Sequence, residues 1–171
     1  MPTHRNRTRS ASSSRRHNTK RDGQRGKRTT ISRLLTATND VRAEHDRHPL
    51  ELSERLCNAI DGHVHELAHF QRHLSHKGLD GSDKMQRMKD AGFDVEYCHE
   101  NLGRNQRTPE HVVSSWMKSP SHRKCMLTPR AERVGFAVAE NKSGETYWGM
   151  DVATEKKTRK QRGSYDRRDR W

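Results

Sequence analysis

Between residues 31 and 117, apolar side chains recur at intervals of three and four, a spacing typical of amphipathic helices. The first helix is predicted over 31–46, and it should end before Pro49 because the residue preceding a proline is displaced from the α region. A second helix begins after Ser53, a residue type that suits the N-cap, and runs toward Leu74. The folded part of the chain is therefore expected to start with two consecutive helices.

Two further helices have recognisable boundaries. A short third helix is predicted from about Ser82, with Gly92 as its C′ residue. The fourth begins at Thr108, which can cap it, and Pro109 suits the first helical position. Pro120 is expected to stop this helix. The predicted core positions of the two helices are Met85, Met88, Val112, Val113, Trp116 and Met117.

Beyond residue 133 the apolar period changes to two, which indicates strands. Val134, Phe136 and Val138 alternate with smaller residues, residues 141–144 make a turn, and a second strand follows over 145–152. Residues 93–98 are a candidate for one more short strand. Three or four helices with a small antiparallel sheet predict either an α+β domain or a layered α/β/α domain.

Positive charge is concentrated at the two ends of the chain. Residues 1–30 hold ten Lys and Arg against one acidic residue, and residues 156–171 hold eight against two. These two segments together carry +15, more than the formal net charge of +13, so residues 31–155 are close to neutral. We therefore divide the chain into a basic N-terminal arm (1–30), a single domain (31–155) and a basic C-terminal arm (156–171).

The N-terminal arm contains almost no large apolar residue and cannot offset its ordering entropy by burial, so we expect it to be disordered in isolation. The C-terminal arm is similar. No apolar stretch follows the N-terminal charges and none has the length of a membrane span. We therefore expect no signal peptide, no transmembrane segment and an intracellular or assembly-associated, for example virion-associated, protein.

Arms of this charge predict contact with an acidic macromolecule, either nucleic acid or a protein surface, through counterion release. The alternative is that they are solvated spacers. The candidate contact residues are Arg15, Arg16, Lys20, Arg21, Arg25, Lys27, Arg28, Lys156, Lys157, Arg159, Lys160 and Arg162.

The number and positions of the cysteine and histidine residues limit the chemistry that the domain can perform. The three cysteines, Cys57, Cys98 and Cys125, form no CxxC pair and allow at most one disulfide, so buried thiols are the default. Most histidines fall on predicted helix surfaces or ends. His76 and His122 are different, together with Glu100, because they are expected at element ends or turns, where side chains can converge.

These three residues belong to ordered motifs that resemble the CAP superfamily (cysteine-rich secretory, antigen and pathogenesis-related proteins) in its short bacterial form. The motifs are Ser75-His76 before a Gly- and Asp-rich turn, Glu100-Asn101, and Trp116 followed by Ser119-Pro120-Ser121-His122-Arg123. Supporting matches include Asn39, Val41, Arg42 and Glu44, then Arg87 with Ala91-Gly92-Phe93, and the strands around Val134 and Tyr147. The resemblance covers roughly residues 33–153.

The resemblance implies a three-layer α–β–α sandwich in which His76, Glu100 and His122 line a solvent-facing cavity, with His99, Asn101 and Ser119 as neighbours. Two imidazoles and a carboxylate suit zinc or another divalent metal, or proton transfer near neutral pH. Larger family members have a second Glu where this chain has Ser119, which counts against catalysis. His99 replaces a usual glycine and Gly103 a usual small apolar residue.

Three functions remain open. The first is a CAP-type binding module, not catalytic, whose cavity holds a metal or small ligand. The second is a structural component of a virion-like or nucleoprotein assembly that uses the basic arms. The third is a metal-assisted hydrolase of peptide or cell-wall material, with His76 or His122 as base and Glu100 orienting it or binding the metal.

Overall fold

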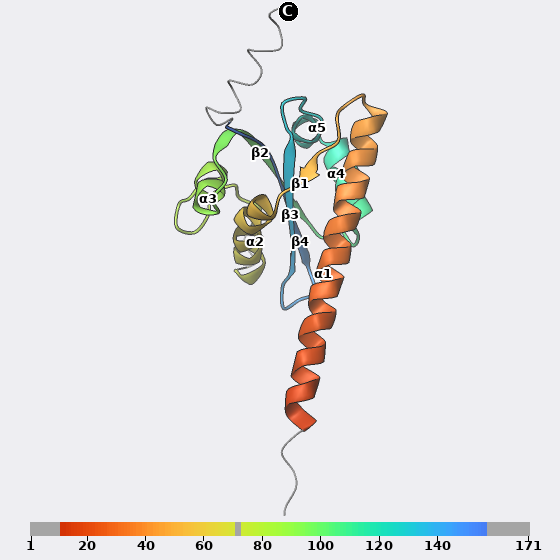
Figure 1. Cartoon of the computed structure of the whole chain (residues 1–171), viewed down its shortest axis with the longest axis vertical. Helices are drawn as coiled ribbons and strands as arrows, with labels where there is room; N and C mark the ends of the chain where they lie inside the picture. Colours follow the sequence, from red (N-terminus) through yellow and green to blue (C-terminus); the bar gives the residue numbers. More distant parts are fainter. Residues whose placement is uncertain (1–10, 71–72, 157–171) are drawn as a thin grey trace, which may run out of the picture.

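The structure is a computed structural model, and it describes residues 11–70 and 73–156, with side chains described from residue 22 onward. Five helices and four strands form three layers in this part of the chain (Figure 1). In chain order they are α1 (Ala11–Glu44), β1 (Glu51–Leu52), α2 (Glu54–His69), α3 (Lys84–Asp90), β2 (Val95–Arg104), α4 (Pro109–Lys118), α5 (Pro120–Met126), β3 (Arg133–Glu140) and β4 (Thr146–Glu155).

The four strands form one sheet in the order β1-β3-β4-β2. The two long pairings, β3 with β4 and β4 with β2, are antiparallel as expected. β1 adds a parallel pairing to β3, with Glu51 opposite Arg133, so the sheet is mixed. A strand of two residues has no alternation to detect, which is why the sequence pattern contained no sign of it.

Helices cover both faces of this sheet (Figure 1). α1, α4 and α5 pack on the face that carries Phe136, Trp148 and Met150. α2 and α3 pack on the other face, where glycine and alanine let α2 lie very close to the strands. A Cβ on Gly135 would lie 2.2 Å from the main-chain carbonyl carbon of Leu56, so no other residue fits there. The expected α–β–α sandwich is confirmed.

α1 is longer than the predicted helix over 31–46. It begins at Ala11, inside the segment expected to be disordered in isolation, and ends at Glu44. Arg, Lys, Gln and Ser are compatible with a helix, so the packed helix can continue toward the N-terminus without a core of its own. Residues 22–29 are all exposed. In this stretch Lys27 is paired with Asp61 of α2, at 2.6 Å.

Other boundaries differ from the sequence prediction in ways that affect the site. β2 runs on through Glu100 to Arg104, so Glu100 lies within a strand and not at its end. Pro120 ends α4 but also opens α5, because proline suits a first helical position. Met85, predicted to face the core, is 39% exposed, whereas Met88 is buried. β4 continues to Glu155.

Candidate functional site

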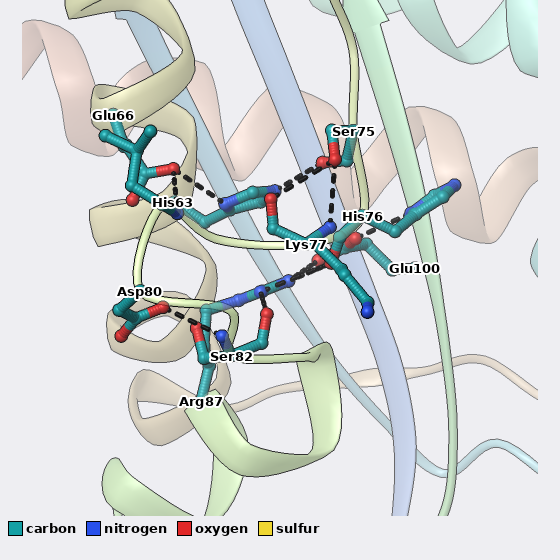
Figure 2. A network of polar contacts seen from close by, with 10 residues as sticks. His63, Glu66, Ser75, His76, Lys77, Asp80, Ser82, Arg87 and Glu100 are labelled. Carbon is teal, nitrogen blue, oxygen red and sulfur yellow. Dashed lines mark hydrogen bonds and ion pairs between the residues drawn. The ribbon is translucent and has the colours of Figure 1, made fainter.

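The carboxylate of Glu100 joins two elements of the fold to β2. Its Oε1 accepts a hydrogen bond from Nδ1 of His76 at 2.7 Å, and its Oε2 accepts one from Nη2 of Arg87 at 2.6 Å (Figure 2). The Glu100 side chain has no exposed surface, whereas that of His76 is 58% exposed. The imidazole is therefore held by a buried carboxylate through one nitrogen while much of the ring faces solvent.

The loop that carries His76 is fixed by side chains of α2. His63 lies in the core with its side chain fully buried, and its Nε2 donates to the carbonyl oxygen of Ser75 at 2.7 Å. Burial and the charge of Arg87 lower the pKa of His63, which favours the neutral ring. One turn on, Glu66 accepts a hydrogen bond from the amide of Leu79 at 2.9 Å.

α3 fixes the other end of the same loop. Nη1 of Arg87 donates to the carbonyl oxygen of Ser82 at 3.1 Å, so one guanidinium binds both this loop and Glu100. Gly78 lies in between, and a Cβ at this position would lie 2.7 Å from side-chain oxygens of Asp80 and Ser82, so these two side chains would have to move. His76 is thus positioned by α2, α3 and β2 together (Figure 2).

His122 lies on α5, which packs on the face of the sheet opposite to α3. Successive residues of a strand point to opposite sides, so Asn101 faces α5 where Glu100 faces α3. Nδ2 of Asn101 donates to the carbonyl oxygen of His122 at 3.0 Å. Burial lowers the pKa of His122, and the charge of His76 lowers it further, so the two imidazoles are electrostatically coupled. The structure thus brings His76 and Glu100 into contact and places His122 nearby without a direct bond to either.

The two remaining predicted neighbours, His99 and Ser119, have other contacts. His99 packs edge-on against Tyr97, with ring centroids 5.0 Å apart. Its pKa is lowered by burial, and then by the charges of Lys84 and Lys124. The hydroxyl of Ser119 lies 3.2 Å from that of Ser121.

Two residues of this region were not among the predicted site residues. Arg87 is one: it belongs to a supporting motif, and its contact with Glu100 depends on the tertiary fold. Asp151 is the other: it lies opposite Glu100 in the register of β2 and β4, it is fully buried, and neither of its oxygens has a partner among the described residues. Its place in the alternating pattern of the last strand was the available signal. Burial, and then the charge of Glu100, raise the pKa of Asp151 well above its usual value.

The raised pKa of Asp151 predicts a stability that falls with rising pH. Above the usual pKa of 3.8 the unfolded chain loses this proton while the folded protein keeps it, so ionisation favours unfolding. Asp151→Asn removes the free-energy cost of holding this buried carboxyl group protonated at a pH where the unfolded chain ionises it. We expect the variant to gain stability relative to the natural protein as pH rises above about 4, by up to about 1.4 kcal/mol per pH unit until Asp151 ionises. Urea unfolding at several pH values measures this, and a difference independent of pH would contradict it.

The residues present do not fit the metal centre that the sequence suggested. Among the side chains of residues 22–70 and 73–156, no group of three or more His, Cys, Asp or Glu is arranged to hold a metal ion. Glu100 already uses both oxygens, one of them on the cation Arg87. The three cysteines are free thiols, and burial raises the pKa of each, so they are poor thiolate ligands.

The predicted basic contacts fall into three groups. Arg25 and Arg28 are exposed on α1, whereas Lys27 is paired with Asp61, and Lys156 with Asp94 at 3.3 Å. Arg15, Arg16, Lys20 and Arg21 lie on α1 at positions whose side chains are not described. The others, Lys157, Arg159, Lys160 and Arg162, lie outside the described residues. None of the described helices has the length and apolarity that a membrane crossing requires.

The fold and the ordered motifs define an α–β–α sandwich of the CAP type. The sequence profile of the Cysteine-rich secretory protein family matches residues 35–152, and the chain belongs to this family. The resemblance inferred from the motifs is thereby confirmed.

Two curated bacterial proteins are similar in sequence. The chain is 27% identical over 111 residues to the uncharacterized protein YkwD of Bacillus subtilis, covering 65% of this chain and 43% of YkwD. It is 24% identical over 110 residues to the uncharacterized membrane protein YlbC of the same species, covering 64% of this chain and 32% of YlbC. The chain thus spans less than half the length of these curated relatives.

Solved structures support the fold. An outer surface protein from Borrelia burgdorferi matches with a TM-score of 0.66 at 20% identity, over 72% of this chain and 90% of that one. An extracellular protein containing a SCP domain from Bacillus anthracis matches with a TM-score of 0.67 at 16% identity, over 75% of this chain and 41% of that one. At these identities the likeness concerns the fold alone.

Proposed function

We propose that this domain is a non-catalytic binding module that takes an anionic ligand at His76. The observation that carries the proposal is the contact between His76 and the buried carboxylate of Glu100, which fixes an exposed imidazole in one orientation. A ring held in this way loses little freedom when it binds, which favours affinity. The charges of Lys84 and Lys124 act on the same strand and favour a negative ligand.

The same contacts support binding over catalysis. A general base needs a nearby proton to abstract, and a nucleophile needs a base within hydrogen-bond reach. The hydroxyl of Ser119 contacts Ser121, and the thiol pKa of Cys98 is raised by burial. Glu100 is occupied by Arg87 and His76. These are features of a rigid recognition surface.

The test uses two small anions, acetate and inorganic phosphate, and the imidazole resonances of isotope-labelled protein. We expect His76 signals to shift in a saturable way at lower concentrations than any other histidine. His76→Ala should abolish the saturable response elsewhere on β2. His65 is a matched control, since its side chain is 57% exposed on α2, and His65→Ala should leave the response unchanged. Equal, non-saturating shifts of both rings would contradict the proposal.

A second function is favoured by the exposed part of α1. Residues 22–29 are exposed on every side of the helix and include Arg25 and Arg28, which have no ion-pair partner among the described residues. A polar helix that extends beyond the domain in this way suits electrostatic contact with nucleic acid phosphates, and this supports the assembly role (Figure 1).

The expected result is a steep salt dependence of duplex DNA binding. For the Arg25→Gln, Arg28→Gln double variant, the slope of log affinity against log salt should fall by about 1.8, because each lost phosphate contact is worth about 0.9. Lys89→Gln with Arg107→Gln is the control, since both residues are exposed elsewhere on the domain. Equal slopes for the two double variants would show that α1 does not bind DNA.

A further inference from the structure

We propose that the outer edge of β2 binds an extended, acidic peptide segment as an additional β-strand, beside His76. This inference rests on the proposed function and names the class of ligand. β2 is a strand of ten residues at one end of the sheet, and β4 is its one neighbour among the described strands. Its second edge is thus without a partner strand in the described part of the chain.

The register of β2 shows which main-chain groups face outward. The amide of Asn105 donates to the carbonyl oxygen of Thr146 at 2.8 Å, so Asn105 bonds toward β4. In an antiparallel pair, bonding and non-bonding positions alternate, so His99, Asn101 and Gly103 also bond toward β4. The main-chain groups of Cys98, Glu100 and Leu102 therefore point away from the sheet.

Side-chain contacts agree with this alternation. Nε1 of Trp116 donates to the carbonyl oxygen of Leu102 at 2.9 Å, as expected for an oxygen that points away from β4. The indole also closes the edge at this end. The amide and carbonyl of Glu100 and those of Cys98 have no hydrogen-bond partner in the described part of the chain. A short stretch centred on Glu100 is left to bind another strand.

Solvent reaches this stretch through the main chain. The Glu100 side chain is 0% exposed, yet the whole residue is 7% exposed. The accessible surface of Glu100 is consequently main-chain surface. A buried side chain with accessible main-chain surface and an unpaired amide and carbonyl is what an added strand would pair with, because main-chain hydrogen bonds supply affinity in strand addition.

The charges around the edge select an acidic segment. Lys84 belongs to α3 and Lys124 to α5, and these helices pack on opposite faces of the sheet, so a cation is carried on each side of β2. Both charges lower the pKa of His99. Two of the nearby acids are engaged: Glu100 holds His76 and Arg87, and Asp83 caps α3 by accepting from the amide of Gln86 at 2.9 Å. A third, Asp151, is fully buried, and its pKa is raised well above the usual value. An added strand would place its side chains next to His76, Lys84 and Lys124.

Two other occupants are disfavoured by the same charges. The amide of Lys156 donates to the carbonyl oxygen of Asp94, which brings the chain's own C-terminal segment to the start of β2. That segment, 157–171, holds seven Lys and Arg against two acidic residues. A second copy of β2 would bring its own Lys84 and Lys124 against the same cations. A separate acidic peptide is therefore the proposed ligand.

Amide hydrogen exchange of the full-length chain tests the proposal. The probe is an acetylated and amidated peptide of about eight residues in which valine and glutamate alternate, long enough to pair along an edge strand. On peptide binding we expect exchange to slow at Cys98 and Glu100 and to stay unchanged at His99, Asn101 and Gly103, which already bond to β4. N-methylation of the peptide at the positions that pair with β2 should weaken binding about tenfold or more, since main-chain hydrogen bonds are lost. Replacing glutamate with lysine should weaken it by a similar factor.

Each other outcome overturns strand addition. Uniform slowing along β2, or none, would exclude it. Protection of the alternate amides in the free protein would assign the edge to residues 157–171, or to a second copy if it increased with protein concentration. If acetate or phosphate saturates His76 while the peptide leaves these amides unchanged, strand addition fails and the anion site stands. If neither anion nor peptide binds, both proposals fail.

Discussion

Replacing Arg42 with alanine is expected to lower the free energy of unfolding by about 3 kcal/mol, one of the largest effects of any single substitution in this chain. Arg42 is on α1 and is fully buried. Its Nε donates to the carbonyl oxygen of His48 at 2.8 Å, and its Nη1 donates to those of Met126 at 2.6 Å and Thr128 at 3.2 Å.

The size of the effect follows from what Arg42 leaves behind. Met126 and Thr128 are at the C-terminal end of α5, where the last carbonyl groups have no partner within the helix and attract a cation. Alanine would leave these buried oxygens unpaired and open a cavity the size of the guanidinium. The hydrogen bonds that join α1 to the end of α5 would also be lost, and α5 carries His122.

Arg47→Ala is the matched control. Arg47 binds the same end of α5, through a hydrogen bond from its Nε to the carbonyl oxygen of Leu127 at 2.9 Å, but it is exposed. Water can replace that bond, so we expect a loss of less than about 1 kcal/mol. Urea unfolding followed by far-ultraviolet circular dichroism measures both. Equal losses for the two variants would show that burial of Arg42 is not the cause.

Arg87→Met is expected to cost about 3–5 kcal/mol, because it leaves the fully buried carboxylate of Glu100 without its cation. The side chain of Arg87 is itself only 10% exposed, so water cannot take its place easily. The loop bearing His76 should loosen as well, since Arg87 also binds Ser82. Urea unfolding measures the loss in free energy of unfolding, and faster amide exchange over residues 75–82 would show that the loop has loosened.

A double variant separates charge burial from packing. When Glu100→Gln is added to Arg87→Met, the uncompensated charge is removed, so the double variant should be more stable than Arg87→Met alone. The coupling energy between the two sites is then large and favourable in the natural protein. Additive losses would mean that Arg87 contributes through its packing alone, and that Glu100 does not depend on it.

Much of the fold was predictable because strong local signals coincide with the buried faces. Ser53 and Thr108 cap α2 and α4, and Gly92 follows α3 with a positive φ of 79°. The alternation around Phe136 places β3 correctly. The elements that were missed are those with weak local signals. β1 has two residues, and α5 starts at the same proline that ends α4.

The sequence predicted which residues form the site but not the contacts that they make with one another. The order of His76, Glu100 and His122 along the chain indicated a shared location, and the fold joins the first two directly. Their role as an acid–base set stays a prediction, and the described side chains form no group that is arranged to hold a metal ion. No local pattern shows that Arg87, from another helix, takes the second oxygen of Glu100, or that Asp151 stands beside it in the sheet.

By itself, the sequence determined the family through its ordered motifs, and with the family the α–β–α class. It also determined most helix and strand positions and the contrast between near-neutral residues 31–155 and the basic ends, because periodicity, caps and charge are properties of neighbouring residues. The tertiary structure decided which side chains neutralise one another and which main-chain groups remain unpaired. These depend on contacts between residues far apart in the chain, such as His76 with Glu100 and Arg42 with Met126. They also depend on burial, which makes an ion pair or an unpaired amide energetically important and which only the assembled layers provide.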